Sequence, residues 1–431
     1  MKKMTIGTPR VQITGNVARL EADVFSKQFE KVFFFEVKSE YGKYLCYERS
    51  DAFVLGLLYF ALVNGYDIEC TVPMSERLYY QLTYVYIPTV VKNDPALFNP
   101  IKIIAPLDNK RIENEGAVGA SVSGGVDSFY SILRNYNNET TNYNITHLVI
   151  ANCSNIYYGE DETRKMFNAL CGNGRNIAKD LGLPIVEIYT NEHIFWYKHY
   201  MDLFCLRYAS FPYALQKLFA VYNYSTGYQY KDFTFTAANK DASHYDFFSV
   251  HLISNENLTL YSSGGEVSRA EKAEFIADNR VVQKRIQVCN VSNNIGNCGQ
   301  CEKCLRTQLN FYACGKLDNF TEAFDVKNFY LQKDKAILNI LSRRGDYDRE
   351  ILSMMKTRGI HISSKIRFIG NIHYFFYSAK QKLKKIELIY KIYHNIKKKR
   401  AKGLNEIINT IESYNSDIEF ARKCDSDIIL F

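Results

Sequence analysis

The clearest chemical signal in the sequence is a glycine-rich loop between an apolar run and an amphipathic run. The loop reads Ser-Gly-Gly-Val-Asp-Ser over residues 123–128. We predict a buried strand over 117–122 and a helix over 127–136, since Phe129, Ile132 and Leu133 mark one helix face. At such a turn, free backbone N–H groups and the positive end of the helix dipole bind phosphate oxygens without a charged side chain.

Each residue type in this loop suits phosphate binding in its own way. Glycines permit positive φ and close approach of the backbone, and serines carry hydroxyl donors. Asp127 can cap the helix or hold Mg²⁺ between phosphates, and a plain turn capped by Asp127 is the structural alternative. Asp127 and Ser128 are also predicted to be catalytic. The predicted nucleotide-binding residues of the loop are Ser123, Gly124, Gly125, Val126, Asp127 and Ser128.

A second signal is a group of four cysteines with the pattern C-x8-C-x2-C-x2-C. Three closely spaced thiolates can reach one cation, and the fourth closes a tetrahedron from a neighbouring strand. Four thiolates leave no open coordination position, which favours a structural Zn²⁺ over a catalytic one. An iron–sulfur cluster and free buried thiols are the alternatives. The predicted ligands are Cys289, Cys298, Cys301 and Cys304.

The segments that position these residues alternate between strand and helix patterns. Strands are predicted over 117–122, 146–151, 184–189, 233–238 and 258–261, and helices over 127–136, 161–181 and 210–222. Such alternation implies an α/β fold with a parallel, doubly wound sheet. Ligands of such a sheet lie beyond the carboxyl ends of its strands, where we expect one crevice. The small or polar segments at these ends are 123–128, 152–155, 190–193, 239–241 and 262–265.

The flanking regions show other patterns, which predicts three domains. Residues 1–115 combine alternating strands with helices over 50–64 and 75–82 and extended segments over 83–91 and 101–105, as in an α+β accessory domain. The nucleotide-binding domain with its zinc site takes 116–325. Residues 326–431 form a helical, basic extension.

Charge gathers in that extension. Residues 365–402 hold twelve Lys or Arg and one acid, a net charge of +11, whereas the whole chain carries +8. Apolar residues recur at helical spacing between Tyr374 and Lys402, which predicts an amphipathic basic helix. RNA, DNA or an anionic membrane could bind there, and a surface helix with a solvated basic face is an equal alternative.

Composition limits the class of protein. The chain has 431 residues, 47% of them hydrophobic, which indicates a globular protein of two or three domains. The N-terminus has no signal-peptide pattern, and the longest apolar run, over 53–63, is too short to span a membrane. We therefore expect a cytoplasmic protein whose eleven cysteines are thiols.

The loop resembles the signature of the PP-loop ATP-pyrophosphatases, of the adenine nucleotide alpha hydrolase-like superfamily. It lacks the Gly-Lys-Ser/Thr ending of kinase-type loops. The resemblance implies a HUP-like α/β domain that cleaves ATP between its α and β phosphates. It also implies that adenine rests against the backbone near residues 150–153. The corresponding nucleotide-binding residues are Ala151, Asn152 and Cys153.

The cysteine spacing narrows the resemblance to the 7-cyano-7-deazaguanine synthase branch, over about residues 116–314. The segment Ser268-Arg-Ala-Glu-Lys272 is similar to the lysine-bearing helix start of that branch, and Arg306 follows the last cysteine. Lys272 and Arg306 are therefore predicted to be catalytic, with Arg269 as a further candidate. Cations near the phosphates would stabilise the charge that develops during adenylation.

That branch implies an ATP-dependent, AMP- and pyrophosphate-forming ligase that amidates a small acid or modified base, with ATP, Mg²⁺ and Zn²⁺ as cofactors. A second hypothesis is a tRNA sulfurtransferase that adenylates a base, with Cys153 as its reactive thiol. A nucleotide-sensing component of a multi-protein system, for example in defence, is a third. A second copy of the chain or an operon-encoded protein could be its partner.

Overall fold

The computed structural model describes residues 2–136, 141–152, 160–195, 203–237, 241–289 and 296–384. The chain divides into two compact units. The first comprises Met1–Ile340 with Arg344–Ile362, and the second comprises Leu341–Arg343 with the chain from Ser363 onward.

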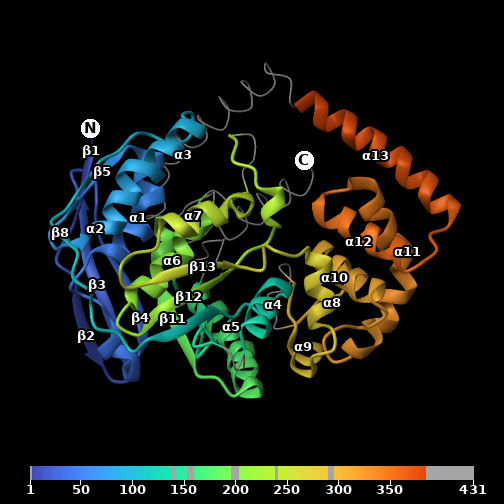
Figure 1. The fold of residues 1–431 in the computed structure, drawn as a ribbon, viewed down its shortest axis with the longest axis horizontal. Helices are drawn as coiled ribbons and strands as arrows, with labels where there is room; N and C mark the ends of the chain where they lie inside the picture. The colour runs from blue at the N-terminus through green and yellow to red at the C-terminus, as the bar shows by residue number, and fades with distance from the viewer. Residues whose placement is uncertain are drawn as a thin grey trace. The chain divides into compact units, whose positions relative to one another are not determined.

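The first unit is built on one large mixed sheet of eleven strands (Figure 1). Its strand order is β13-β12-β9-β10-β11-β4-β3-β1-β5-β7, with β2 paired to β3. All neighbours from β13 to β11 are parallel, whereas β11–β4, β4–β3 and β3–β1 are antiparallel. The strands are β1 (Lys2–Ile6), β2 (Arg10–Thr14), β3 (Val17–Ser26), β4 (Glu30–Lys38), β5 (Tyr66–Cys70), β7 (Ile103–Ile104), β9 (Ala117–Ser121), β10 (His147–Ala151), β11 (Ile185–Thr190), β12 (Phe219–Ser225) and β13 (Thr259–Ser263).

Helices connect and cover these strands. Helix α4 packs on β9 and β12, and α5 packs on β10 and β11. The mixed α/β class with a mostly parallel sheet is thus confirmed at this coarse level. The helices of the first unit include α1 (Asp51–Asn64), α2 (Glu76–Tyr80), α3 (Ile87–Asn93), α4 (Val126–Arg134), α5 (Glu160–Leu181), α6 (Phe204–Ala214), α7 (Asp246–Leu252), α8 (Arg269–Ile276), α9 (Arg280–Arg285), α10 (Glu302–Ala313), α11 (Val326–Arg343, whose last three residues belong to the second unit) and α12 (Asp346–Thr357).

The strand that follows α6 differs from the prediction made from the sequence. The prediction of a helix over 210–222 fails because α6 ends at Ala214, just after Pro212, and Phe219–Ser225 forms β12. This strand pairs with β9 on one side and β13 on the other, so sheet pairing overrides the helical spacing of its apolar residues. The predicted strand over 233–238 is also wrong, since residues 233–237 form no strand and residue 238 lies outside the described residues.

The segment over 83–91, for which the sequence predicts an extended conformation, is helical. A π-helical turn over Gln81–Tyr86 runs directly into α3. Its β-branched and aromatic residues suggested a strand, but Leu82, Tyr86 and Val90 follow one another at helical spacing and are fully buried. Tertiary packing decides the conformation here.

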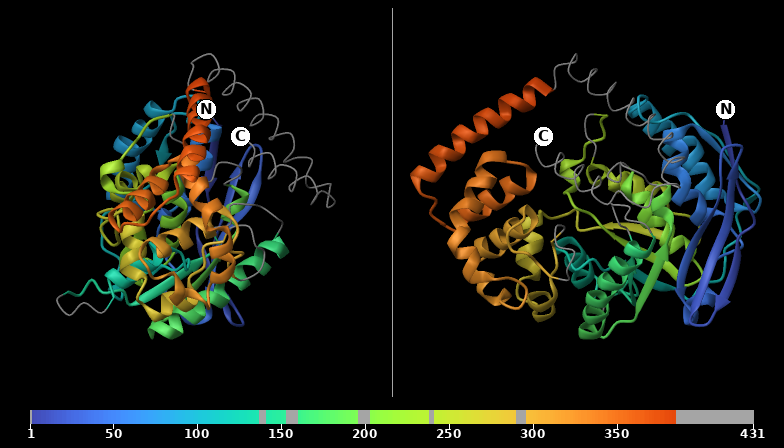
Figure 2. Two further views of the ribbon diagram at one scale, coloured as in Figure 1. Left: turned by 90° about the vertical axis from the view of Figure 1, so that its right-hand side faces the viewer. Right: turned by 180° about the vertical axis from the view of Figure 1, so that it is seen from behind.

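The N-terminal region and the nucleotide-binding region share the sheet and the core. Strands β3 and β4 form a long antiparallel hairpin, drawn in blue in Figure 2, and β4 pairs with β11 through Tyr189–Glu36 and Thr190–Phe35. Phe35 contacts Phe53 of α1 and Phe211 of α6, with ring centroids 5.6 and 6.5 Å apart. The sheet is therefore continuous across residue 115, and the predicted domain limits stay a prediction.

The described part of the second unit is dominated by α13 (Ser364–Lys384). Gly370 of α13 lies against Leu341, where a Cβ would come within 2.6 Å of the Leu341 Cβ. Phe368, Phe375 and Phe376 are exposed on this helix. Of the predicted basic helix over 374–402, the part beyond residue 384 lies outside the described residues.

Candidate functional site

The glycine-rich loop connects the end of β9 to the start of α4. Gly124 has φ of +74°, and a Cβ on it would lie 3.1 Å from the Asn173 amide nitrogen, so both backbone and space favour glycine. Gly125 is the N-cap of α4, and Val126 is fully buried. The Gln287 backbone N–H donates to the Gly124 carbonyl at 2.9 Å. The loop is thus held at the N-terminus of α4 by the hydrogen bond from Gln287 and by packing against Asn173.

The serines of the loop bond to its own backbone. The Ser128 hydroxyl donates to the Ser121 carbonyl at 2.8 Å and accepts from the Ser123 N–H at 3.1 Å. The Ser123 hydroxyl accepts from the Gly125 N–H at 3.3 Å. Ser128 is buried and Ser123 is exposed. Ser128 therefore shapes the loop, and Ser123 is its exposed serine.

Asp127 is the point on which two cations from α8 converge. Arg269 donates to one carboxylate oxygen, and the Lys272 Nζ lies 3.2 Å from the other. Burial alone would raise the pKa of Asp127, but the charges of Arg269 and Lys272 outweigh it and hold the pKa below its ordinary value. Asp127 is therefore a carboxylate at neutral pH, and α8 is tied to the loop.

Lys272 joins the carboxyl ends of three parallel strands. Its fully buried Nζ donates to the Thr226 carbonyl, just after β12, at 2.7 Å, besides its contact with Asp127 after β9. Gly264, just after β13, has φ of +96°, and a Cβ there would lie 3.2 Å from Nζ. The ammonium group thus lies at the edge of the sheet where a ligand of an α/β fold is expected.

Arg306 on α10 extends this group of charges. Its guanidinium carbon lies 4.8 Å from the centroid of the Tyr347 ring, and that of Arg269 lies 5.2 Å from the same ring. Burial and the repulsion of Arg269 lower the pKa of Arg306, which still leaves it charged. Its ion-pair partner Glu302 is 58% exposed. We call Arg269, Lys272 and Arg306 the cation cluster.

The residues predicted to hold adenine are only partly described. Asn152 is buried, and its side-chain amide donates to the Thr190 carbonyl and accepts from the Thr190 N–H, both at 2.7 Å. This amide therefore ties the end of β10 to the end of β11. Ala151 is the last residue of β10, and Cys153 lies outside the described residues.

The four predicted cysteine ligands come together. Their sulfur atoms all lie within 4.8 Å of one another, with Cys298–Cys304 at 3.9 Å and Cys301–Cys289 at 4.0 Å. Four sulfurs bound tetrahedrally to zinc at about 2.3 Å would be about 3.8 Å apart, so the cluster needs little movement to close on the ion. Burial raises the pKa of the Cys304 thiol well above its ordinary value. The cluster can hold a metal ion, and zinc suits its donor set.

Neighbouring groups fix the cluster in shape. The Asn297 side chain accepts from the Val288 N–H at 2.8 Å and donates to the Ile286 carbonyl at 2.8 Å. The Gln308 amide donates to the carbonyls of Gly299 and Cys304. Because Cys304 and Arg306 share helix α10, a metal ion at the cysteines would also fix the position of Arg306.

Three further residues belong to this site although no sequence motif points to them: Thr226, Asp246 and Tyr347. The Thr226 hydroxyl donates to Asp246, whose two oxygens lie 2.8 and 2.7 Å away. Burial raises the pKa of Asp246 to about 7. A correct prediction of β12 would have pointed to Thr226 at its end. Tyr347 is brought in by a distant helix and belongs to no motif.

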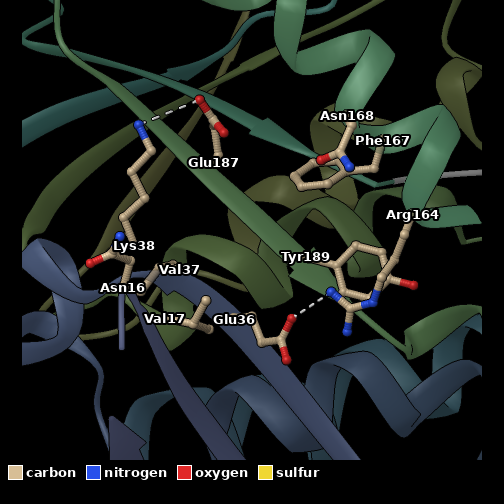
Figure 3. Close-up of a pocket in the computed structure, with 10 residues that line it drawn as sticks. All are labelled: Asn16, Val17, Glu36, Val37, Lys38, Arg164, Phe167, Asn168, Glu187 and Tyr189. Carbon is tan, nitrogen blue, oxygen red and sulfur yellow. Dashed lines mark hydrogen bonds and ion pairs between the residues drawn. The ribbon is translucent and has the colours of Figure 1, made fainter. Parts of the chain in front are cut away.

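A separate cavity of about 160 Å³ lies where β4 meets β11 (Figure 3). Its charges are paired: Arg164 contacts Glu36 at 2.9 Å, and Lys38 contacts Glu187 at 3.8 Å. β11 is two strands from β9 in the sheet. This cavity is therefore a feature of the strand junction and lies apart from the loop.

Comparisons with family models, with curated proteins and with solved structures returned no match to this chain. Within the described residues, none of the helices combines the length and the apolar character that crossing a bilayer requires.

Proposed function

We propose that this protein is a PP-loop ATP-pyrophosphatase that transfers AMP to a carboxylate or carbonyl oxygen of an acceptor and then amidates it, as the 7-cyano-7-deazaguanine synthases do. The observation that carries the proposal is the convergence of Arg269 and Lys272 on Asp127, at the N-terminus of α4 and beside the glycine-rich loop. The loop offers backbone donors to phosphate oxygens, and Arg269 and Lys272 add positive charge beside it.

This reaction requires stabilisation of the negative charge that develops on the leaving group more than it requires a covalent catalyst. An acceptor oxygen attacks the α-phosphorus, the bond to the bridging oxygen breaks, and pyrophosphate leaves with the electron pair. Negative charge grows on the leaving group, and preorganised cations stabilise it. Arg269 and Lys272 would take this part, with Arg306 beside them. A nucleophile such as ammonia then displaces AMP from the activated carbon.

The metals would take different parts. Mg²⁺ would neutralise charge on the phosphates, and Asp127 is the loop carboxylate that could hold it in place of one of its present cation partners. Zn²⁺ at Cys289, Cys298, Cys301 and Cys304 would be structural, because four thiolates fill its coordination.

An acceptor could lie in an apolar groove one wall of which contacts the segment that follows β13. The groove has a volume of about 550 Å³, within the usual range for small-molecule sites. The Tyr230 N–H donates to the Gly265 carbonyl at 2.8 Å, which ties one wall to the end of β13. Its lining residues are Tyr230, Phe233, Phe247, Phe248, His251 and Leu252.

The sulfurtransferase alternative needs a reactive thiolate, and nothing among the described residues favours it. The described cysteines outside the cluster are all buried, and burial raises the pKa of each to about 12; they are Cys46, Cys70, Cys171, Cys205 and Cys314. Such thiols are poor nucleophiles.

The proposal is tested by incubating the protein with ATP, Mg²⁺, ammonium and a panel of small carboxylic acids. We expect AMP and pyrophosphate in equal amounts, because the loop lacks the lysine that kinase-type loops place on the β and γ phosphates. ADP as the main product would refute the proposal.

Two variants locate the site within that assay. Asp127→Asn and Ser123→Ala should abolish or strongly reduce AMP formation, whereas Asp180→Asn, whose carboxylate pairs with Arg285 at 2.7 Å, should leave it unchanged. Asp127→Asn is preferred to Asp127→Ala because it preserves the side-chain volume between the two cations. Near-normal activity of the Asp127 variant would show that the site lies elsewhere.

A further inference from the structure

Helix α12 lies beyond residue 314, where the family resemblance ends, yet two of its side chains reach the cation cluster. Tyr347 and Glu350 are three residues apart and share one face of α12, which packs against both α8 and α10. Those two helices carry Arg269, Lys272 and Arg306. Helix α12 is therefore placed to control how the cations are arranged.

The Tyr347 ring makes cation–π contacts with two guanidinium groups. Arg269 and Arg306 lie 5.2 and 4.8 Å from its centroid, both within cation–π range. Two like charges so close repel each other, and this repulsion helps to lower the pKa of Arg306. The electron-rich face of the ring offsets that cost.

The ring itself is held in place. Its hydroxyl donates to the Gly227 carbonyl at 3.1 Å, and a Cβ on Gly227 would come within 3.0 Å of the hydroxyl oxygen. The ring also stacks on Tyr228, at 4.8 Å and 11°, and Tyr228 stacks on His244 at 3.7 Å. The stack joins α12 to the loop that follows β12.

Glu350 fixes the start of α8. One of its oxygens accepts from the backbone N–H groups of Arg269 at 2.9 Å and Ala270 at 3.4 Å. These are the first two residues of α8, where N–H groups have no partner within the helix. The helix that delivers Arg269 and Lys272 to Asp127 is thus anchored by α12.

We propose that Tyr347 is a positioning residue, which holds Arg269 and Arg306 together, against their repulsion, in the arrangement that receives the pyrophosphate part of the substrate. This inference rests on the proposed function. It adds a residue from outside the resembling region, and it assigns to α12 the task of completing the anion site. Tyr347 acts through the two arginines and needs no contact with ATP.

The experiment measures binding of pyrophosphate alone to the full-length, zinc-loaded protein by calorimetry. Tyr347→Leu should weaken binding about 10- to 100-fold, as expected for the loss of two cation–π contacts. Tyr347→Phe keeps the ring and should stay within about 3-fold of wild type. Tyr330→Leu, a tyrosine on α11 outside the cluster, is the matched control and should change nothing.

A double-mutant cycle separates positioning from general stability. In an Arg306→Met background, Tyr347→Leu should cost less than in wild type, because one of its two partners is gone. If Tyr347→Leu fails to fold, Arg306→Lys serves in its place, since it keeps the charge but lacks the planar group that stacks. It should weaken pyrophosphate binding about 10-fold.

The outcomes are distinct. Equal pyrophosphate affinity in wild type, Tyr347→Leu and Arg306→Lys overturns the inference, and so does a wild type that binds no pyrophosphate at millimolar concentration. Additive losses in the cycle also overturn it. ADP formation from ATP by a wild type that shows the expected binding pattern would refute the proposed function while leaving the positioning role of Tyr347 intact.

Discussion

Buried charged residues lie at both ends of strands β12 and β13. At one end two carboxylates contact one cation, and at the other end two cations contact one carboxylate. Before the strands, Arg49 is surrounded by carboxylates: its guanidinium contacts Asp108 at 3.1 Å and Glu256 at 3.7 Å, with Asp51 close by. After the strands, two members of the cation cluster, Arg269 and Lys272, converge on the carboxylate of Asp127.

The two groups of charged residues differ in how their excess charge can be balanced. At the first end, Asp51 accepts hydrogen bonds from the Ser75 N–H and the Asn255 amide, and burial raises its pKa to about 6, so this carboxylate can take up a proton just below neutral pH. Arginines cannot shed their charge in this way. The surplus at the second end would be balanced by a bound anion, which is why we propose a stabilising role for the first end and ligand binding for the second.

The largest expected effect comes from the metal. Cys301→Ser should abolish stoichiometric zinc, because a structural zinc site contributes on the order of 10 kcal/mol and rarely survives with three thiolates. Metal analysis and a thermal melt measure it, and about one zinc per wild-type chain is expected. Cys314→Ser, a buried thiol outside the cluster, should keep its zinc. Iron in the wild type, or unchanged zinc in Cys301→Ser, would contradict the assignment.

The next prediction concerns the end of β12 and β13 that carries Arg49. Arg49→Met should destabilise the fold by about 3–5 kcal/mol, because it leaves the buried carboxylate of Asp51 and the largely buried one of Glu256 without their cation. The activity of the protein that remains folded should be unchanged. Thermal melting measures the loss, and the exposed Arg111→Met is the control. A loss of AMP formation per folded molecule would contradict the proposal that the end with Arg49 stabilises the fold and the end with Asp127 binds the ligand.

The second end should behave in the opposite way. Lys272→Met should reduce AMP formation about 10²- to 10³-fold, the usual cost of removing one preorganised stabilising group. Its Tm should fall less than that of Arg49→Met, since methionine fills the space and Asp127 keeps Arg269. Lys284→Met, an exposed lysine on α9, is the control. Equal activity of the two lysine variants would remove Lys272 from the site.

The smallest effect concerns Asp246, which accepts a hydrogen bond from the Thr226 hydroxyl. Its folded pKa, about 7, lies above the ordinary value of 3.8, so the folded state binds the proton more tightly and loses stability as pH rises between these values. The loss is about 1 kcal/mol per pH unit and ends near pH 7. Asp246→Asn removes the titration, so its Tm should rise relative to wild type from pH 5 to pH 8. A constant difference in Tm would contradict the raised pKa.

How far the sequence could predict this molecule depends on the range of the interactions. The loop around Gly124 and the cysteines near Cys301 are local patterns, so their residues could be named from spacing alone. Lys272 required a family resemblance. The place of Thr226 depends on β12 pairing between β9 and β13, and that of Tyr347 depends on α12 packing against α8, both across long stretches of chain. No local pattern encodes such pairings.

The pairing of β4 with β11 decides where the chain can be cut. A fragment beginning at Gly116 would keep the glycine-rich loop and the cysteines but would lose the strand that covers Tyr189 and Thr190. Its β11 would then present unpaired backbone groups along a sheet edge, and Phe211 would lose its contact with Phe35. Such a fragment should self-associate through that edge, so expression of the nucleotide-binding region calls for residues 1–115 in the same chain.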